Sequence, residues 1–152
     1  MEMNYILFLK AFQEKYHGIK DAQLLFQYLR EELQYLVLQA LYTKTVYPIY
    51  FMGGTLLRLS YGINRFSEDI DLALDKPNAD FPAEKFHEGI TRTFSEKVTG
   101  FNMTGKLNTN RNVVKIMLSF EKILFDTGIS PLTAQTIKIK IELDTNPPGY
   151  AT

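Results

Sequence analysis

The sequence predicts an α+β protein, with helices in the N-terminal part and with strands and helices after it. Seven apolar residues between positions 25 and 41 recur at helical spacing and form one stripe. Residues 69–74 and 137–144 instead alternate strictly between polar and apolar, which is typical of strands. The short apolar run 49–52 precedes two glycines, and its length favours a buried strand.

The expected helices share helical apolar spacing or a recognisable end, and they cover residues 4–15, 21–43, 55–61 and 82–97. Asp21 is the expected N-cap of the second helix, and Gly62 is expected to end the third. On the second helix, Arg30, Glu31 and Gln34 are expected to face water mostly.

The expected strands are apolar or alternating segments, and they cover residues 49–52, 69–74, 101–107, 112–120 and 137–144. The third and fourth form a hairpin around residues 108–111. Pro147 and Pro148 end the last strand. Residues 121–135 fit neither pattern clearly.

Composition excludes several classes of protein. The 152 residues suffice for one domain with a real core. The absence of Cys excludes disulfides, thiolate zinc sites and cysteine nucleophiles, and two His make a histidine-rich metal site improbable. Apolar runs are too short for a membrane span, and the opening run 5–9 does not resemble a signal peptide. We therefore expect a cytoplasmic protein without a membrane partner.

Charge is unevenly distributed along this chain of zero net charge. Residues 66–88 carry seven acidic and two basic side chains, whereas residues 92–140 carry eight basic and three acidic ones. An acidic centre beside a basic half suits a metal site that faces a phosphate-bearing ligand. The simpler interpretation is that most of these charges are solvated at the surface.

Asp69 and Asp71 are two residues apart in an alternating segment. On a strand both carboxylates point to the same face, with their Cα atoms roughly 7 Å apart. Mg²⁺ prefers carboxylate oxygens together with waters and substrate phosphates. Without a cation, mutual repulsion would raise one pKa. Surface loops also contain Asp-x-Asp, and the surrounding apolar strand leaves both interpretations open.

Gly53-Gly54-Thr55 lies between an expected strand and an expected helix. Glycines let the backbone approach a phosphate closely, and a helix N-terminus offers free N–H groups and a positive dipole end. The Thr55 hydroxyl could cap the helix or donate to a phosphate oxygen. A Gly-Gly pair is also common in ordinary turns.

Four polar side chains of the last strand share one face, namely Lys138, Lys140, Glu142 and Asp144. If this strand lies beside residues 69–74, Glu142 or Asp144 supplies a third carboxylate, and Lys140 can neutralise phosphate charge. An edge strand with one solvated face would show the same pattern.

The order of these elements is more specific than any one of them. The runs Gly53–Arg58 and Arg65–Leu72 resemble the nucleotidyltransferases of the DNA polymerase β superfamily. Within that superfamily they look like the AbiEii-type toxins of type IV toxin–antitoxin and abortive-infection systems. The resemblance is specific over residues 51–74 and weaker at residues 138–144.

This resemblance implies a nucleotidyltransferase-like mixed β-sheet flanked by helices, in a single domain over residues 1–152. Its helical part is expected at about 1–46 and its catalytic sheet at about 47–146. The family also has a helical C-terminal region, which this chain is expected to lack. The resemblance further implies transfer of a nucleoside monophosphate from an NTP, supported by two Mg²⁺ ions, or by Mn²⁺ in their place.

The resemblance assigns roles to individual residues. Asp69 and Asp71 match the family's two metal-binding acids. Glu142 is the better match for the third acid, with Asp144 as an alternative metal ligand. The expected catalytic residues are therefore Asp69, Asp71 and Glu142. The expected nucleotide-binding residues are Gly53, Gly54, Thr55, Arg65, Ser67 and Lys140.

The resemblance also implies partners. Relatives modify the 3′ end of tRNA, so RNA is the expected acceptor, and a cognate antitoxin and a homo-oligomer are further expected partners. The basic residues between 92 and 140 favour RNA slightly. A small-molecule or protein acceptor, and a non-catalytic remnant that binds NTP or a partner, remain alternatives.

Overall fold

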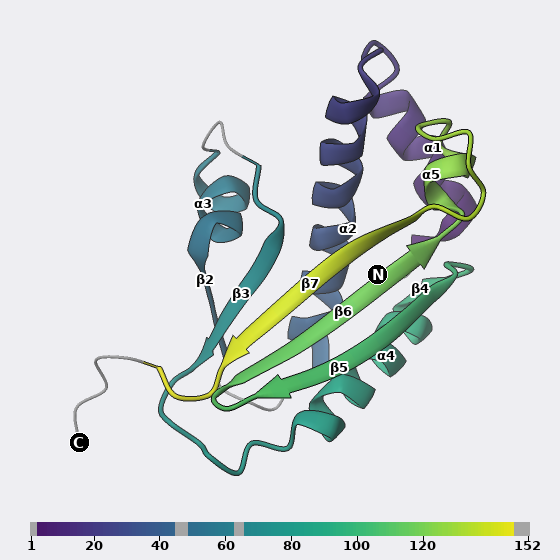
Figure 1. Ribbon diagram of the computed structural model, residues 1–152. Coiled ribbons are helices and arrows are strands. Elements are labelled where there is room, and N and C mark those ends of the chain that lie inside the picture. Colours follow the sequence, from purple (N-terminus) through teal and green to yellow (C-terminus); the bar gives the residue numbers. More distant parts are fainter. Residues whose placement is uncertain (1–2, 45–48, 63–65, 148–152) are drawn as a thin grey trace.

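A computed structural model describes residues 3–44, 49–62 and 66–147. A five-stranded mixed sheet with the strand order β2-β3-β7-β6-β5 forms its centre (Figure 1). The strands are β2 (Ile49–Met52), β3 (Asp69–Leu74), β5 (Met103–Asn110), β6 (Val113–Glu121) and β7 (Thr136–Asp144). β3 and β7 are parallel, and the other neighbours in this sheet are antiparallel. The predicted α+β fold with a mixed sheet is confirmed.

The helices are α1 (Tyr5–Lys15), α2 (Ala22–Lys44), α3 (Gly53–Tyr61), α4 (Ala83–Lys97) and α5 (Ile123–Asp126). α2 and α4 contact each other and pack against β7 and β5, and Figure 1 shows both helices behind the sheet. α3 lies beside β2 and β3 at the other edge. A second, two-stranded parallel sheet joins β1 (Met3–Asn4) to β4 (Val98–Thr99), which the sequence did not indicate.

Local signals explain where the helices begin and end. The Asp21 carboxylate accepts the Gln23 N–H at 2.9 Å, so the predicted N-cap of α2 is confirmed. Asn4 caps α1 in the same way through the Ile6 N–H. Gly62 ends α3 as predicted, with φ of 68° and its N–H donating to the Arg58 carbonyl.

β7 has one apolar face in the core and one polar face on the other side of the sheet. Its apolar residues are at most 1% exposed, namely Ile137, Ile139, Ile141 and Leu143. Because side chains alternate along a strand, the intervening polar residues share the opposite face. β7 lies between β3 and β6, so the interpretation of residues 137–144 as an edge strand is wrong. None of the helices within the described ranges is both long and apolar enough to cross a bilayer.

Three boundaries differ from expectation. α3 begins at Gly53 rather than at Thr55. The hairpin turns at Arg111 and Asn112 rather than over residues 108–111, with Arg111 at φ of 54°. The ambiguous residues 121–135 contain α5, which follows Lys122 at φ of 68°. β5 runs to Asn110, beyond the apolar residues that marked the expected strand, because backbone pairing with β6 continues through polar residues.

Candidate active site

The parallel pairing of β3 with β7 brings three acids together. Asp71 lies opposite Glu142, and Asp69 lies opposite Lys140 in the same register. One carboxylate oxygen from each of Asp69, Asp71 and Glu142 lies within 4.8 Å of the others. We call these three residues the carboxylate cluster. All three are half-buried, on two neighbouring inner strands of the sheet.

The cluster concentrates negative charge where water is partly excluded. Burial, and then the charges of Asp69 and Glu142, raise the pKa of Asp71 above its ordinary value. The Lys140 Nζ lies 3.9 Å from an Asp69 oxygen and offsets part of that charge. The three carboxylates form a donor set that suits a hard divalent cation.

Asp144 does not belong to the carboxylate cluster. It lies opposite Ala73 of β3, two residues after Glu142 and on the same face of β7. Its Oδ1 accepts the Asn146 N–H at 2.8 Å, an interaction that stabilises the turn after β7. Of the two candidates for the third acid, the geometry groups Glu142 with Asp69 and Asp71.

The backbone conformation of residue 53 and its close approach to Asp71 favour glycine at this position. Its φ is +80°, and a Cβ atom built there would lie 2.5 Å from Asp71 Oδ2 and 3.1 Å from Asp71 Cβ. β2 places Met52 opposite Asp71, so the chain passes from β2 into α3 directly beside that carboxylate. The predicted Gly-Gly turn therefore adjoins the carboxylate cluster.

Thr55 is fully buried, and its hydroxyl donates to the Asp69 carbonyl. This hydrogen bond ties the first turn of α3 to the start of β3. The single hydroxyl hydrogen is thereby used, so the side chain holds Asp69 in position. Within the described residues, the N-cap of α3 has no side-chain hydrogen bond, and the N–H groups of a first helical turn are suited to bind an anion.

Gln34 is buried beside the segment before β3, whereas it was predicted to face water mostly. It is 2% exposed, and its Nε2 donates to the Ser67 carbonyl at 2.9 Å and the Glu68 carbonyl at 3.3 Å. The two carbonyls immediately precede Asp69. A helical-wheel signal was available, because Gln34 lies seven residues before buried Leu41 and so on nearly the same side of α2.

Arg30 and Glu31 also face the protein rather than water. Their side chains are 11% and 15% exposed. Glu31 pairs with Arg58 of α3 at 2.7 Å, and the Arg58 guanidinium lies 4.3 Å from the centre of the Phe66 ring. These contacts join α2, α3 and the segment before β3 into one support for the cluster.

The structure gives little information on two of the predicted nucleotide-binding residues, Arg65 and Ser67. Arg65 lies outside the described residues. Ser67 is half-buried, and its carbonyl accepts from Gln34 as given above. Their predicted contacts with nucleotide remain predictions.

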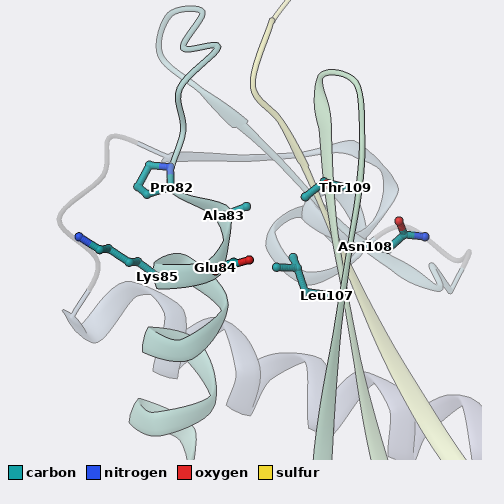
Figure 2. A pocket seen from close by; sticks show the side chains of 7 residues that line it. All are labelled: Pro82, Ala83, Glu84, Lys85, Leu107, Asn108 and Thr109. Atoms are coloured by element: carbon teal, nitrogen blue, oxygen red, sulfur yellow. The ribbon is translucent and has the colours of Figure 1, made fainter.

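A cavity of about 690 Å³ lies away from the carboxylate cluster (Figure 2). It is lined by Pro82, Ala83, Glu84, Lys85, Leu107, Asn108 and Thr109, from the start of α4 and the end of β5. Figure 2 shows Glu84 directed toward Leu107, whereas Lys85 points away. One acid and one outward-facing base form no catalytic constellation, so volume alone does not mark the site.

Comparison with known proteins identifies the family of this chain. A family model described as the nucleotidyl transferase AbiEii toxin of type IV toxin–antitoxin systems matches residues 39–152. The chain belongs to the AbiEii family. The match covers β2, α3, β3 and β7, which carry the cluster and its glycine turn. A search of curated proteins finds no match.

Solved structures show the same fold as this AbiEii-family chain. A candidate nucleotidyltransferase from H. pylori matches 79% of this chain and 46% of its own, with a TM-score of 0.51 and 19% identity. JHP933 from Helicobacter pylori matches 78% of this chain and 43% of its own, with a TM-score of 0.50 and 18% identity. The chain thus spans less than half the length of either structure.

Proposed function

We propose that this chain transfers a nucleoside monophosphate from an NTP to RNA, at the 3′ end of tRNA, as a toxin of a type IV toxin–antitoxin system. The carboxylate cluster carries this proposal, because strand register places Asp71 opposite Glu142. Family membership supports nucleotidyl transfer and a toxin role. Such a reaction needs NTP and RNA, which fits a cytoplasmic location. Membership in a toxin family of type IV toxin–antitoxin systems supports a cognate antitoxin as a partner.

The donor set fits Mg²⁺, or Mn²⁺ in its place. Asp69, Asp71 and Glu142 would hold the ion through oxygen atoms, the ligands that hard cations prefer. Burial, and then repulsion from Asp69 and Glu142, raise the pKa of Asp71, and a bound cation would offset both effects by stabilising the charged carboxylate. When bound, the metal neutralises charge on the phosphates and activates the acceptor hydroxyl.

The remaining side chains would position the nucleotide. Gly53 and Gly54 bring backbone N–H groups at the start of α3 beside Asp71, where they can bind phosphate oxygens. Lys140, only 3.9 Å from Asp69, can shift to neutralise phosphate charge. Thr55 and Gln34 fix the backbone on both sides of Asp69. Catalysis then comes mainly from positioning and charge neutralisation.

Label transfer tests the proposal. The chain is incubated with each α-labelled NTP, Mg²⁺ and total RNA, and labelled RNA is resolved by size. We expect a metal-dependent label in a tRNA-sized band with one preferred NTP. Asp71→Asn and Glu142→Gln should abolish the label, whereas Asp144→Asn, on the same face of β7 but outside the cluster, should retain it.

Other outcomes redirect the proposal. Metal-dependent label in a protein or a small molecule, with none in RNA, would exclude RNA as the acceptor while supporting nucleotidyl transfer. NTP binding without transfer to any acceptor would support the alternative of a non-catalytic, NTP-binding chain. Equal loss in Glu142→Gln and Asp144→Asn would contradict the assignment of the third acid.

A further inference from the structure

We infer that the open face of β5, β6 and β7 binds the phosphate backbone of the RNA acceptor through Lys106, Lys115 and Lys138. We call these three lysines the basic face. The inference rests on the proposed transfer to RNA and assigns the surface that guides the acceptor to the carboxylate cluster.

Strand register places the basic face in line with the cluster. Lys106 lies opposite Met117, which lies opposite Lys140, which lies opposite Asp69. In the next row, Lys115 lies opposite Glu142, and Glu142 opposite Asp71. Paired residues in neighbouring strands point to the same side of a sheet. At roughly 4.8 Å between strands, Lys115 lies about 10 Å from Asp71.

This face is open to solvent. Lys106, Lys115 and Lys138 are all exposed. In Figure 1, α2 and α4 lie behind β5–β7, and no described helix crosses in front of these strands. Within the described ranges, none of the three lysines forms an ion pair. Their charge is therefore available to an external anion.

The acids that share this face outside the cluster are engaged locally. Glu121 accepts from Asn102 Nδ2 at 3.2 Å at the far end of β6, and Asp144 accepts the Asn146 N–H. A bound divalent metal would offset most of the charge of the carboxylate cluster itself. Glu121 and Asp144 keep their charge, but four lysines of β5–β7 share the face with them, Lys140 included. The formal charge of the face outside the cluster is therefore positive, which attracts a polyanion rather than a neutral ligand.

A groove connects the basic face to the cluster. It has a volume of about 310 Å³ and is lined by Phe26, Arg30, Glu68, Asp69, Met117, Thr136, Lys138 and Lys140. Lys138 thus belongs both to the basic face and to the wall of a groove that contains Asp69. The groove also offers a ring, Phe26, and a thioether, Met117, against which a base can pack. This combination of cations and apolar surface fits a nucleotide strand better than an acidic protein segment.

RNA binding without turnover tests the inference. Anisotropy of labelled tRNA is measured with Mg²⁺ but without NTP over a series of salt concentrations, for the wild type and the triple variant K106Q/K115Q/K138Q. We expect the triple variant to lower the slope of log affinity against log salt by about 2–3, and to weaken binding about 10²-fold at 0.1 M salt. The matched control K10Q/K20Q/K85Q removes three exposed lysines elsewhere and should keep the wild-type slope.

A second measurement separates this inference from the proposed function. Binding of Mn²⁺ and NTP to the triple variant should equal that of the wild type, because none of its lysines belongs to the cluster. An unchanged salt slope in the triple variant, or equal losses in the control, would overturn the basic face. Tighter lysine-dependent binding of polyglutamate than of tRNA would reassign the face to an acidic protein. Lysine-dependent RNA binding without NTP binding would retain the basic face and refute nucleotidyl transfer.

Discussion

The two faces of the five-stranded sheet differ in what their residues do for the protein. On β7, Ile139 and Ile141 are fully buried in the core, whereas Glu142 belongs to the carboxylate cluster and Lys140 lies beside it. The apolar face gains free energy from burial. On the polar face, partial burial and then the neighbouring charges of Asp69 and Glu142 raise the pKa of Asp71, which is unfavourable for folding. One face therefore stabilises the fold, and the other is free to serve function.

The strongest test of this division is Asp71→Asn. We expect nucleotidyl transfer to fall by about 10³-fold or more, because a metal ligand supplies several kcal/mol of charge stabilisation. In metal-free buffer, the variant should have a Tm equal to that of the wild type or up to about 2 °C higher, because the repulsion is relieved. Radiolabel transfer and calorimetry measure the two effects.

Metal addition supplies the control for Asp71→Asn. Mn²⁺ should raise the Tm of the wild type and leave that of the variant almost unchanged, since binding to the folded state alone stabilises it. A variant that unfolds several degrees earlier without metal would mean that Asp71 is structural, and would break the comparison between the two faces.

The opposite face is tested by Ile141→Ala. Ile141 is fully buried and lies opposite Ile70 and Ile116, so truncation leaves a cavity in the centre of the core. We expect the free energy of unfolding to fall by about 3 kcal/mol, measured by urea titration. Lys138→Ala, on the exposed face of the same strand, should change it by less than about 0.5 kcal/mol.

Gly53→Ala tests whether the glycine at the start of α3 is needed to keep Asp71 in place. The new Cβ would lie 2.5 Å from Asp71 Oδ2, so Asp71 must move. A displacement of about 1 Å in a reacting group costs about 10²-fold in rate, and we expect a loss of that size in single-turnover transfer.

Gly62→Ala is the matched control for Gly53→Ala. Gly62 has a similar φ of +68°, but nothing lies within 4 Å of its Cβ position. It should lose about 1 kcal/mol of stability from left-handed backbone strain and keep its activity. Equal losses of activity in both variants would show that strain, rather than contact with Asp71, explains the role of Gly53.

Much of this arrangement could be predicted because period-two alternation fixes which side chains share a face. Asp69 with Asp71, and Glu142 with Lys140, were assigned to common faces from spacing alone. The choice between Glu142 and Asp144 needed the register of β3 against β7, which is set by long-range packing. Alternation in one strand does not determine its partner, so the sequence left both acids and the edge-strand interpretation open.

Other features depended on contacts between distant segments. The turn at Arg111 and Asn112 requires a left-handed residue that carries no glycine signal. Gln34 was predicted to face water mostly, yet its side-chain amide donates to two backbone carbonyls of another segment. Buried polar residues of this kind follow from tertiary structure, and helical spacing shows only that Gln34 is on the inner side.

Gln34→Leu has the smallest expected effect on activity among these variants. It tests whether Gln34 of α2 only stabilises the fold or also positions Asp69 for metal binding. Leu keeps the volume roughly but leaves the buried Ser67 carbonyl without its donor, so we expect a loss of about 1–2 kcal/mol in unfolding free energy. Gln23→Leu, exposed on the same helix, should change neither stability nor transfer. If Gln34 also positions Asp69, Mn²⁺ affinity and single-turnover rate should each fall about tenfold in protein that is still fully folded. Loss of stability with unchanged Mn²⁺ affinity would instead assign Gln34 to the fold alone, and would confine the functional residues to the polar face of the sheet and the glycine turn beside it.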